Sequence, residues 1–121
     1  MTRLRIAALA ALAAAGVIAT ALPAAAEFFG WQVKNVPVWD VLNVRAWPNS
    51  GSQILVGYPN GTPLSLTGKC TAGLKLDDIN GWPKWKQAQA VRTRWCQVWV
   101  DPLGSGDFRA GWVYGKYITP L

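Results

Sequence analysis

From Val41 onward, apolar and polar side chains alternate along the chain. In Leu42–Arg45 the leucine and the valine alternate with polar residues, and the same pattern returns in Leu64–Cys70 and in Trp95–Val100. A period of two is typical of a half-buried β-strand. Shorter apolar runs at Ile54–Val56 and Gly111–Tyr114 are bounded by glycine and polar residues. We therefore expect an all-β fold, a small antiparallel barrel or sandwich of five or six short strands.

Turn residues separate these runs. Tyr58–Gly61 ends in Asn-Gly, a pair that tolerates the positive φ angles of tight hairpins. Ala46–Gln53 contains proline, asparagine, serine and glycine, which predicts a long loop around Trp47. Asp101–Ala110 has the same character and predicts a hairpin loop. Asp101 and Asp107 there resemble a calcium loop only faintly, and a plain turn is the better interpretation.

The segment Thr71–Arg94 is far longer than a normal hairpin loop. Within it, Pro83 suits a first helical turn, and Lys84–Val91 has a composition that permits a helix. We expect this insertion, residues 71–94, to be partly helical. Its aromatic residues could pack with Val91 onto Trp99 as a satellite core, which is the interpretation we favour for them.

The N-terminus has the pattern of a secretory signal peptide. A basic start, Met1–Arg5, precedes the apolar run Ile6–Leu22 and the small residues Ala24–Ala26. Cleavage after Ala26 would leave one domain, residues 41–121, preceded by an extension, residues 27–40, that packs Phe28, Phe29 or Trp31 against it. The alternative is an uncleaved membrane anchor, for which the apolar run is slightly short. After cleavage we expect no membrane span and a periplasmic or secreted protein.

Two cysteines, Cys70 and Cys96, lie in this exported chain without metal-type spacing. In an oxidising compartment such a pair indicates a disulfide, and two free buried thiols are the alternative. The chain has no histidine, which excludes Cys-His and Ser-His nucleophilic pairs and histidine-based zinc sites. A domain of this size rarely offers the deep cleft that a pair of catalytic carboxylates needs. We therefore expect no enzymatic activity, no metal and no cofactor.

Several motifs in order resemble the bacterial SH3-like domain, written SH3b. They are "LNVRAWP", "ILVGYPNGTPLSL" and the later "WCQVWV" and "GWVYGKYI", and together they span about Val41–Ile118. The paired cysteines resemble an exported subgroup of that family. The resemblance implies an SH3-like barrel and a non-catalytic module that binds peptidoglycan, at its peptide stem or its glycan. The long insertion and the tryptophan after Arg45 depart from the family pattern.

Eight tryptophans are more than a core of this size needs. Trp47 follows Arg45 in a loop that lines the groove of SH3-like folds, and a flat indole ring there could stack on a sugar or a proline-like segment. By resemblance, Trp112, Tyr114 and Tyr117 would contact the same ligand. Structural packing is the alternative for the two tyrosines and for Tyr58, which could also stand near the groove.

The net charge of +6 falls to +4 without Arg3 and Arg5, and the remaining excess lies in Ile79–Val100, which holds four cations and no acid. We expect Lys84 and Lys86 at the rim of the groove, facing carboxylates or other anionic envelope polymers, unless they form only a solvated face. Export argues against a nucleic acid as the partner. The rival function is a protein–protein module that docks an envelope partner such as a wall hydrolase. The sequence carries no signal for an oligomeric state.

Overall fold

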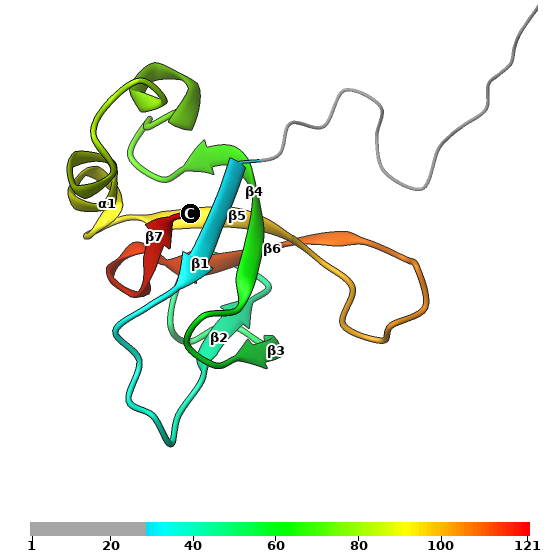
Figure 1. The fold of residues 1–121 in the computed structure, drawn as a ribbon. Coiled ribbons are helices and arrows are strands. Elements are labelled where there is room, and N and C mark those ends of the chain that lie inside the picture. The colour runs from blue at the N-terminus through cyan, green and yellow to red at the C-terminus, as the bar shows by residue number, and fades with distance from the viewer. Residues whose placement is uncertain (1–28) are drawn as a thin grey trace, which may run out of the picture.

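A computed structural model describes residues 29–121, so the predicted signal peptide, residues 1–26, lies outside the described residues, as does Phe28. One antiparallel sheet of seven strands dominates the fold (Figure 1). The strands are β1 (Phe29–Val33), β2 (Leu42–Arg45), β3 (Ile54–Tyr58), β4 (Pro63–Cys70), β5 (Trp95–Val100), β6 (Arg109–Tyr114) and β7 (Ile118–Pro120). The helices are the 3₁₀ turns η1 (Leu76–Ile79) and η2 (Gly115–Tyr117) and the α-helix α1 (Lys84–Val91). The all-β prediction is confirmed.

The strands follow the order β3-β2-β6-β5-β4-β1-β7. The sequence predicted five or six strands, and the structure has seven because the segment before Val41 and the end of the chain also pair. β1 lies between β4 and β7, with Trp31 opposite Leu64 on one side and opposite Pro120 on the other. Part of the expected N-terminal extension is therefore an inner strand. The ladders found among residues 29–121 end at β3 and β7, so barrel closure stays a prediction.

Alternate positions of the strands supply the core. Val44, Leu66, Val98 and Val113 are fully buried, and each comes from a different strand. Trp31 of β1 also belongs to the core cluster. Complete burial of an aliphatic side chain of this size stabilises a fold by about 1.5–3 kcal/mol. The two-residue period read from the sequence thus marks the face that folding removes from water.

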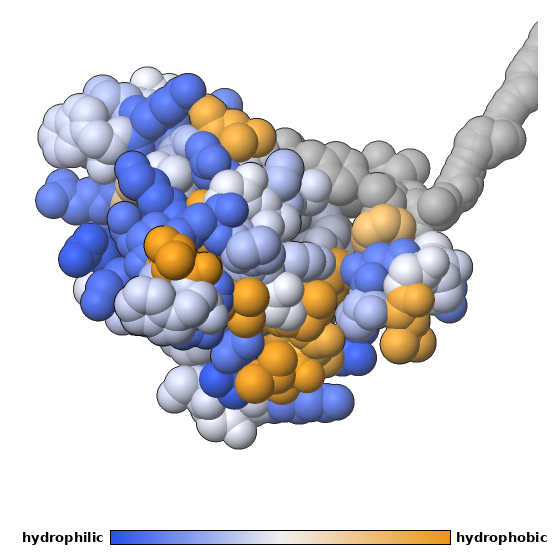
Figure 2. Space-filling model, turned by 60° about the horizontal axis from the view of Figure 1, so that its bottom comes forward, coloured by the Kyte–Doolittle hydropathy of each residue, from blue (hydrophilic) through white to orange (hydrophobic). Residues whose placement is uncertain are grey.

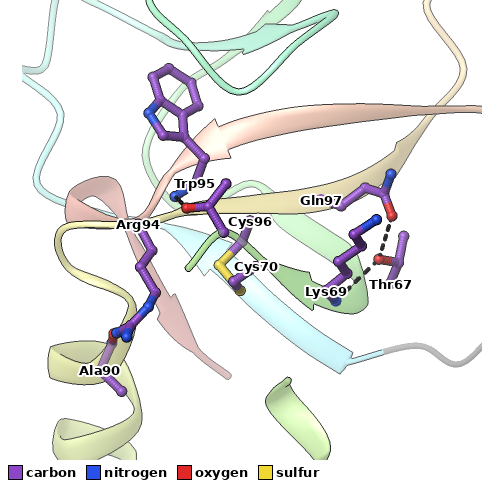
Figure 3. The surroundings of a disulfide bond; sticks show 9 residues. Thr67, Lys69, Cys70, Ala90, Arg94, Trp95, Cys96 and Gln97 are labelled. Carbon is purple, nitrogen blue, oxygen red and sulfur yellow. Dashed lines mark hydrogen bonds between the residues drawn. A yellow bond between two sulfur atoms is a disulfide. The ribbon is translucent and has the colours of Figure 1, made fainter. Parts of the chain in front are cut away.

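A disulfide joins Cys70 at the end of β4 to Cys96 in β5 (Figure 3). The two residues are opposite each other in the β4–β5 ladder, and both are buried. The predicted pairing is confirmed, and it fits a non-cytoplasmic protein because disulfides persist in oxidising compartments. None of the helices described in residues 29–121 has the length and apolar character to cross a bilayer.

The disulfide also closes the base of the insertion. Beside it, the Thr71 N–H donates to Trp95 O at 2.8 Å, and the Trp95 N–H donates to Thr71 Oγ1 at 2.9 Å. The insertion therefore leaves and rejoins the sheet at one cross-linked point. In Figure 1, its helix α1 lies to one side of the sheet, while the connection between β5 and β6 extends to the other.

The helix begins and ends where the sequence indicated, at Lys84 and Val91. Val91 is fully buried, and α1 packs against β7 and η2. The favoured satellite core is wrong for the aromatic residues, since Trp82 is 39% and Trp85 68% exposed. An eight-residue helix fixed through its last turn leaves its first turn, which carries Trp85, in solvent.

Candidate functional site

One hollow in the described part of the chain is a groove of about 550 Å³. Trp95, Tyr114 and Tyr117 line it, together with residues 36–37 and 40–43 of the β1–β2 connection and β2, Arg45 at the end of β2, and residues 48–50 of the β2–β3 loop. We call this site the aromatic groove. It is open to solvent on one side and has a volume typical of a small-ligand site.

The three rings form a continuous series. The centroids of Trp95 and Tyr114 are 5.3 Å apart with their planes at 55°, and those of Tyr114 and Tyr117 are 6.4 Å apart at 57°. Trp95 and Tyr114 are partners in the β5–β6 ladder, which places their side chains on the same face of the sheet. Tilted pairs at these distances are favourable contacts of the ring quadrupoles. Because each ring supports the next, the surface is organised before a ligand arrives.

One wall of the groove is tied to the turn between β3 and β4. The Val36 N–H donates to Asn60 Oδ1 at 3.0 Å, and Asn60 Nδ2 donates to Val36 O. Further along, the Asp40 N–H donates to Pro37 O at 2.9 Å, which turns the chain back toward β2. The asparagine that the sequence assigned to a tight turn thus also holds the groove wall in place.

The other wall is held by one serine. Ser52 Oγ donates to Trp47 O at 2.9 Å and accepts from the Trp47 N–H at 3.2 Å. Arg45 Nη1 donates to Ser52 O at 2.9 Å. These contacts close the loop that carries Pro48, Asn49 and Ser50 into the groove lining.

The predicted contact residues are only partly brought together. Tyr114 and Tyr117 line the aromatic groove. Trp47 is 68% exposed and precedes the lining residues of its loop without being one of them. Trp112 is only 9% exposed and borders a different hollow, with Phe29 and residues 67–75, because it packs into the sheet rather than over the groove.

The two lysines do not reach the groove lining either. Lys84 borders a separate hollow beside β1 and the C-terminus. Lys86 Nζ lies 4.6 Å from the ring centroid of Trp82, a cation–π contact within the insertion. We expected both lysines at the rim of the groove, but neither is among the residues that line it. The reason is that α1 packs against β7 and η2.

Trp95 is the groove residue that sequence reasoning missed. It alternates with the buried residues of β5, so its side chain lies on the opposite face of the strand from the core. The signal that could have found it is the pairing of β5 with β6, which sets it opposite Tyr114. The charges of the lining are balanced, with Asp40 and Arg45 as its acid and its base.

Exposed apolar side chains lie in the β1–β2 connection and in β3. Val38 and Trp39 in the β1–β2 connection are 90% and 86% exposed, and Val41 and Ile54 are also exposed. Figure 2 brings forward the side of the molecule where β2 and β3 lie, and hydrophobic surface gathers at its centre with hydrophilic surface on both flanks.

Tyr58 of β3 is not part of the groove lining. Its burial, and secondly the charge of Asp101, raise the pKa of its hydroxyl above 10.0.

Asp101 acts as a turn residue. Its Oδ1 accepts from the Ser105 N–H at 3.1 Å and its Oδ2 from the Gly106 N–H at 2.8 Å. Both carboxylate oxygens thus bond to the backbone of their own loop. This geometry supports the plain turn that the sequence favoured over a calcium loop.

No protein-family model, curated protein or solved structure matches this chain in comparison searches. The SH3b resemblance therefore stays a prediction from the motifs.

Proposed function

We propose that this protein is an exported, non-catalytic binding module of the bacterial cell envelope that holds peptidoglycan, at its peptide stem or its glycan, in the aromatic groove. The observation that carries the proposal is the series Trp95, Tyr114 and Tyr117 along one open hollow. The disulfide and the SH3b-like motifs support it independently of the groove.

The chemistry of the groove suits such a ligand. Aromatic rings bind the apolar faces of sugars and extended peptide segments, while the indole N–H and phenol O–H groups each supply a directional hydrogen bond. Asp40 and Arg45 give the lining one charge of each sign. Peptide stems carry both carboxylates and amines, so a lining with both signs matches them better than one with a single sign.

The contact residues of the proposal are Trp95, Tyr114 and Tyr117, with Trp47 at the edge of the groove. Trp47 is exposed next to Pro48, which does line the groove, so its ring is available to a ligand longer than the hollow. Trp112 and the two lysines of α1 are left out of this surface.

A second function is a protein–protein module without wall binding. The exposed Val38 and Trp39 favour it, because aromatic and aliphatic side chains displayed together near a groove are typical anchors of protein interfaces. In that case the groove and the β1–β2 connection would receive a segment of an envelope protein such as a wall hydrolase.

Co-sedimentation of residues 27–121 with purified sacculi separates the two functions. The proposal expects the protein in the pellet at low and at moderate salt, because stacking on rings is less sensitive to ionic strength than charge pairing. Protein that stays in the supernatant at both salt concentrations would exclude wall binding and leave the protein–protein function.

A further inference from the structure

Another hollow, of about 290 Å³, is lined by residues of α1, of η2 and β7, and of the start of the β1–β2 connection. Lys34, Arg92 and Lys116 line it, together with Trp85. None of the residues that line it is acidic. We call it the cationic pocket. It shares no lining residue with the aromatic groove.

Three separate segments bring these cations together, and backbone contacts fix each segment. The Lys34 N–H donates to Tyr117 O at 2.8 Å, which joins the start of the β1–β2 connection to η2. The Gly115 N–H donates to Arg94 O at 2.7 Å, which joins η2 to the residues after α1. The pocket is therefore a product of the fold and not of one basic run in the sequence.

One face of α1 forms a side of the pocket. Trp85, Ala88, Gln89 and Arg92 follow a spacing of three and four residues, which places them on the same helical face. Trp85 is 68% exposed, so much of its flat ring is open to solvent at the pocket that Arg92 also lines. Lys116 of η2 also lines the pocket, and its Nζ lies 5.6 Å from the ring centroid of Tyr117, which belongs to the aromatic groove.

Cations gathered without an acid repel one another and attract an anion into the same space. A tryptophan beside them adds a surface on which a ring can stack. We propose that the cationic pocket binds an anionic saccharide polymer, with its carboxylate or phosphate groups on Lys34, Arg92 and Lys116 and a sugar ring on Trp85. A saccharide fits better than a nucleic acid because the disulfide indicates an oxidising compartment.

This site extends the proposed function and does not depend on it. Lys116 lines the cationic pocket while its neighbour Tyr117 lines the aromatic groove, so η2 separates the two sites. A wall with neutral and anionic polymers could occupy the aromatic groove and the cationic pocket at the same time. Two linked binding sites raise the overall avidity without any additional contact.

The test is the binding of residues 27–121 to soluble polymers, measured by calorimetry. Polygalacturonate supplies carboxylates on sugars, phosphorylated dextran supplies phosphates on sugars, and unmodified dextran has no charge. We expect binding to at least one of the two charged polymers and none to dextran, with affinity that falls as salt rises. Stronger binding to one charged polymer identifies which anion the pocket takes.

Variants locate the binding. Lys116→Gln should weaken the affinity for the charged polymer roughly three- to tenfold. Lys69→Gln is the matched control, since Lys69 is exposed and lies outside the pocket. Trp85→Ala should weaken the affinity for polygalacturonate or phosphorylated dextran about fivefold. The affinity for inorganic polyphosphate should not change, because this polymer has no ring to stack on the indole. Binding of sacculi by the aromatic groove is measured separately, so a failure here and a failure of the groove are distinguishable.

Three results would overturn the proposal. One is no binding to either charged polymer, and another is equal weakening by Lys69→Gln and Lys116→Gln. The third is tighter binding of a single-stranded oligothymidylate than of both charged saccharides, with Trp85→Ala abolishing it, which would assign the pocket to nucleic acid.

Discussion

Gly115 lies directly against the last turn of α1. A Cβ atom built at Gly115 would stand 1.8 Å from Val91 O, far inside any real contact, and the atom that blocks it is backbone. Val91 is itself fully buried. The absence of a side chain at one position in η2 thus allows the insertion to dock on the sheet, and this contact places α1 beside the cationic pocket.

Gly115→Ala should therefore destabilise the protein by about 3 kcal/mol or more, since the backbone of α1 has to move away. Urea denaturation measures the loss. Gly81→Ala is the control, because a Cβ at Gly81 meets nothing within 4 Å. It should change the free energy of unfolding by less than about 1 kcal/mol. Equal stability of the two variants would show that the α1–η2 contact is not tight.

The disulfide should contribute about 3–4 kcal/mol to stability, because it joins residues separated by 26 positions and restricts the unfolded chain. The double variant Cys70→Ala/Cys96→Ala removes it without leaving a free thiol. Its free energy of unfolding, compared with that of the oxidised protein, gives the contribution. A double variant as stable as the oxidised protein would contradict the prediction.

Stability should fall as pH rises above about 10. The pKa of Tyr58 is raised on folding, mainly by burial and secondly by the charge of Asp101, so the folded state holds this proton more tightly than the unfolded state. Its contribution is complete below the unfolded pKa of 10.0 and is lost as pH rises through the higher folded value. Other groups titrate in this range, so Tyr58→Phe is the reference. The fall from pH 9 to 11 should be shallower in that variant, and an equal slope would refute the prediction.

Ser52→Ala should loosen the loop that carries Pro48 to the groove. The variant loses the hydroxyl that donates to Trp47 O and accepts from the Trp47 N–H, at a cost of about 1 kcal/mol at this exposed position. Ligand affinity should fall while the fold persists, which amide exchange of residues 46–53 by NMR would show as faster exchange confined to this loop. Unchanged exchange there would mean that Ser52 does not hold the loop.

The sequence predicts much of this fold because its signals are local. The alternation in Leu42–Arg45 and Trp95–Val100 reports burial directly, and the bounds of α1 follow from Pro83 and the helix-permitting residues after it. β1 was read as an extension because Phe29–Val33 has no clean period. β1 pairs with β4 on one edge and with β7 on the other. Only the tertiary structure determines this pairing.

The candidate site was less predictable, since it depends on distant segments. Tyr114 and Tyr117 were found through motif resemblance, but Trp95 needed the register of β5 on β6. Trp112, which the resemblance assigned to the ligand, is buried where it borders another hollow. The basic segment Ile79–Val100 contains only Arg92 of the three cations that line the cationic pocket. Lys34 and Lys116 come from other segments and join it only after folding.

The most direct measurement compares Tyr114→Ala with Phe108→Ala in co-sedimentation with purified sacculi. Both changes remove an aromatic ring, but Tyr114 lies in the middle of the groove series and Phe108 is an exposed residue outside the groove lining. Thermal unfolding of both variants first establishes that each is folded. We predict that Tyr114→Ala reduces the pelleted fraction at least about fivefold, while Phe108→Ala pellets like the unchanged protein. Equal pelleting of a folded Tyr114→Ala variant and the unchanged protein would contradict recognition of the wall through these rings.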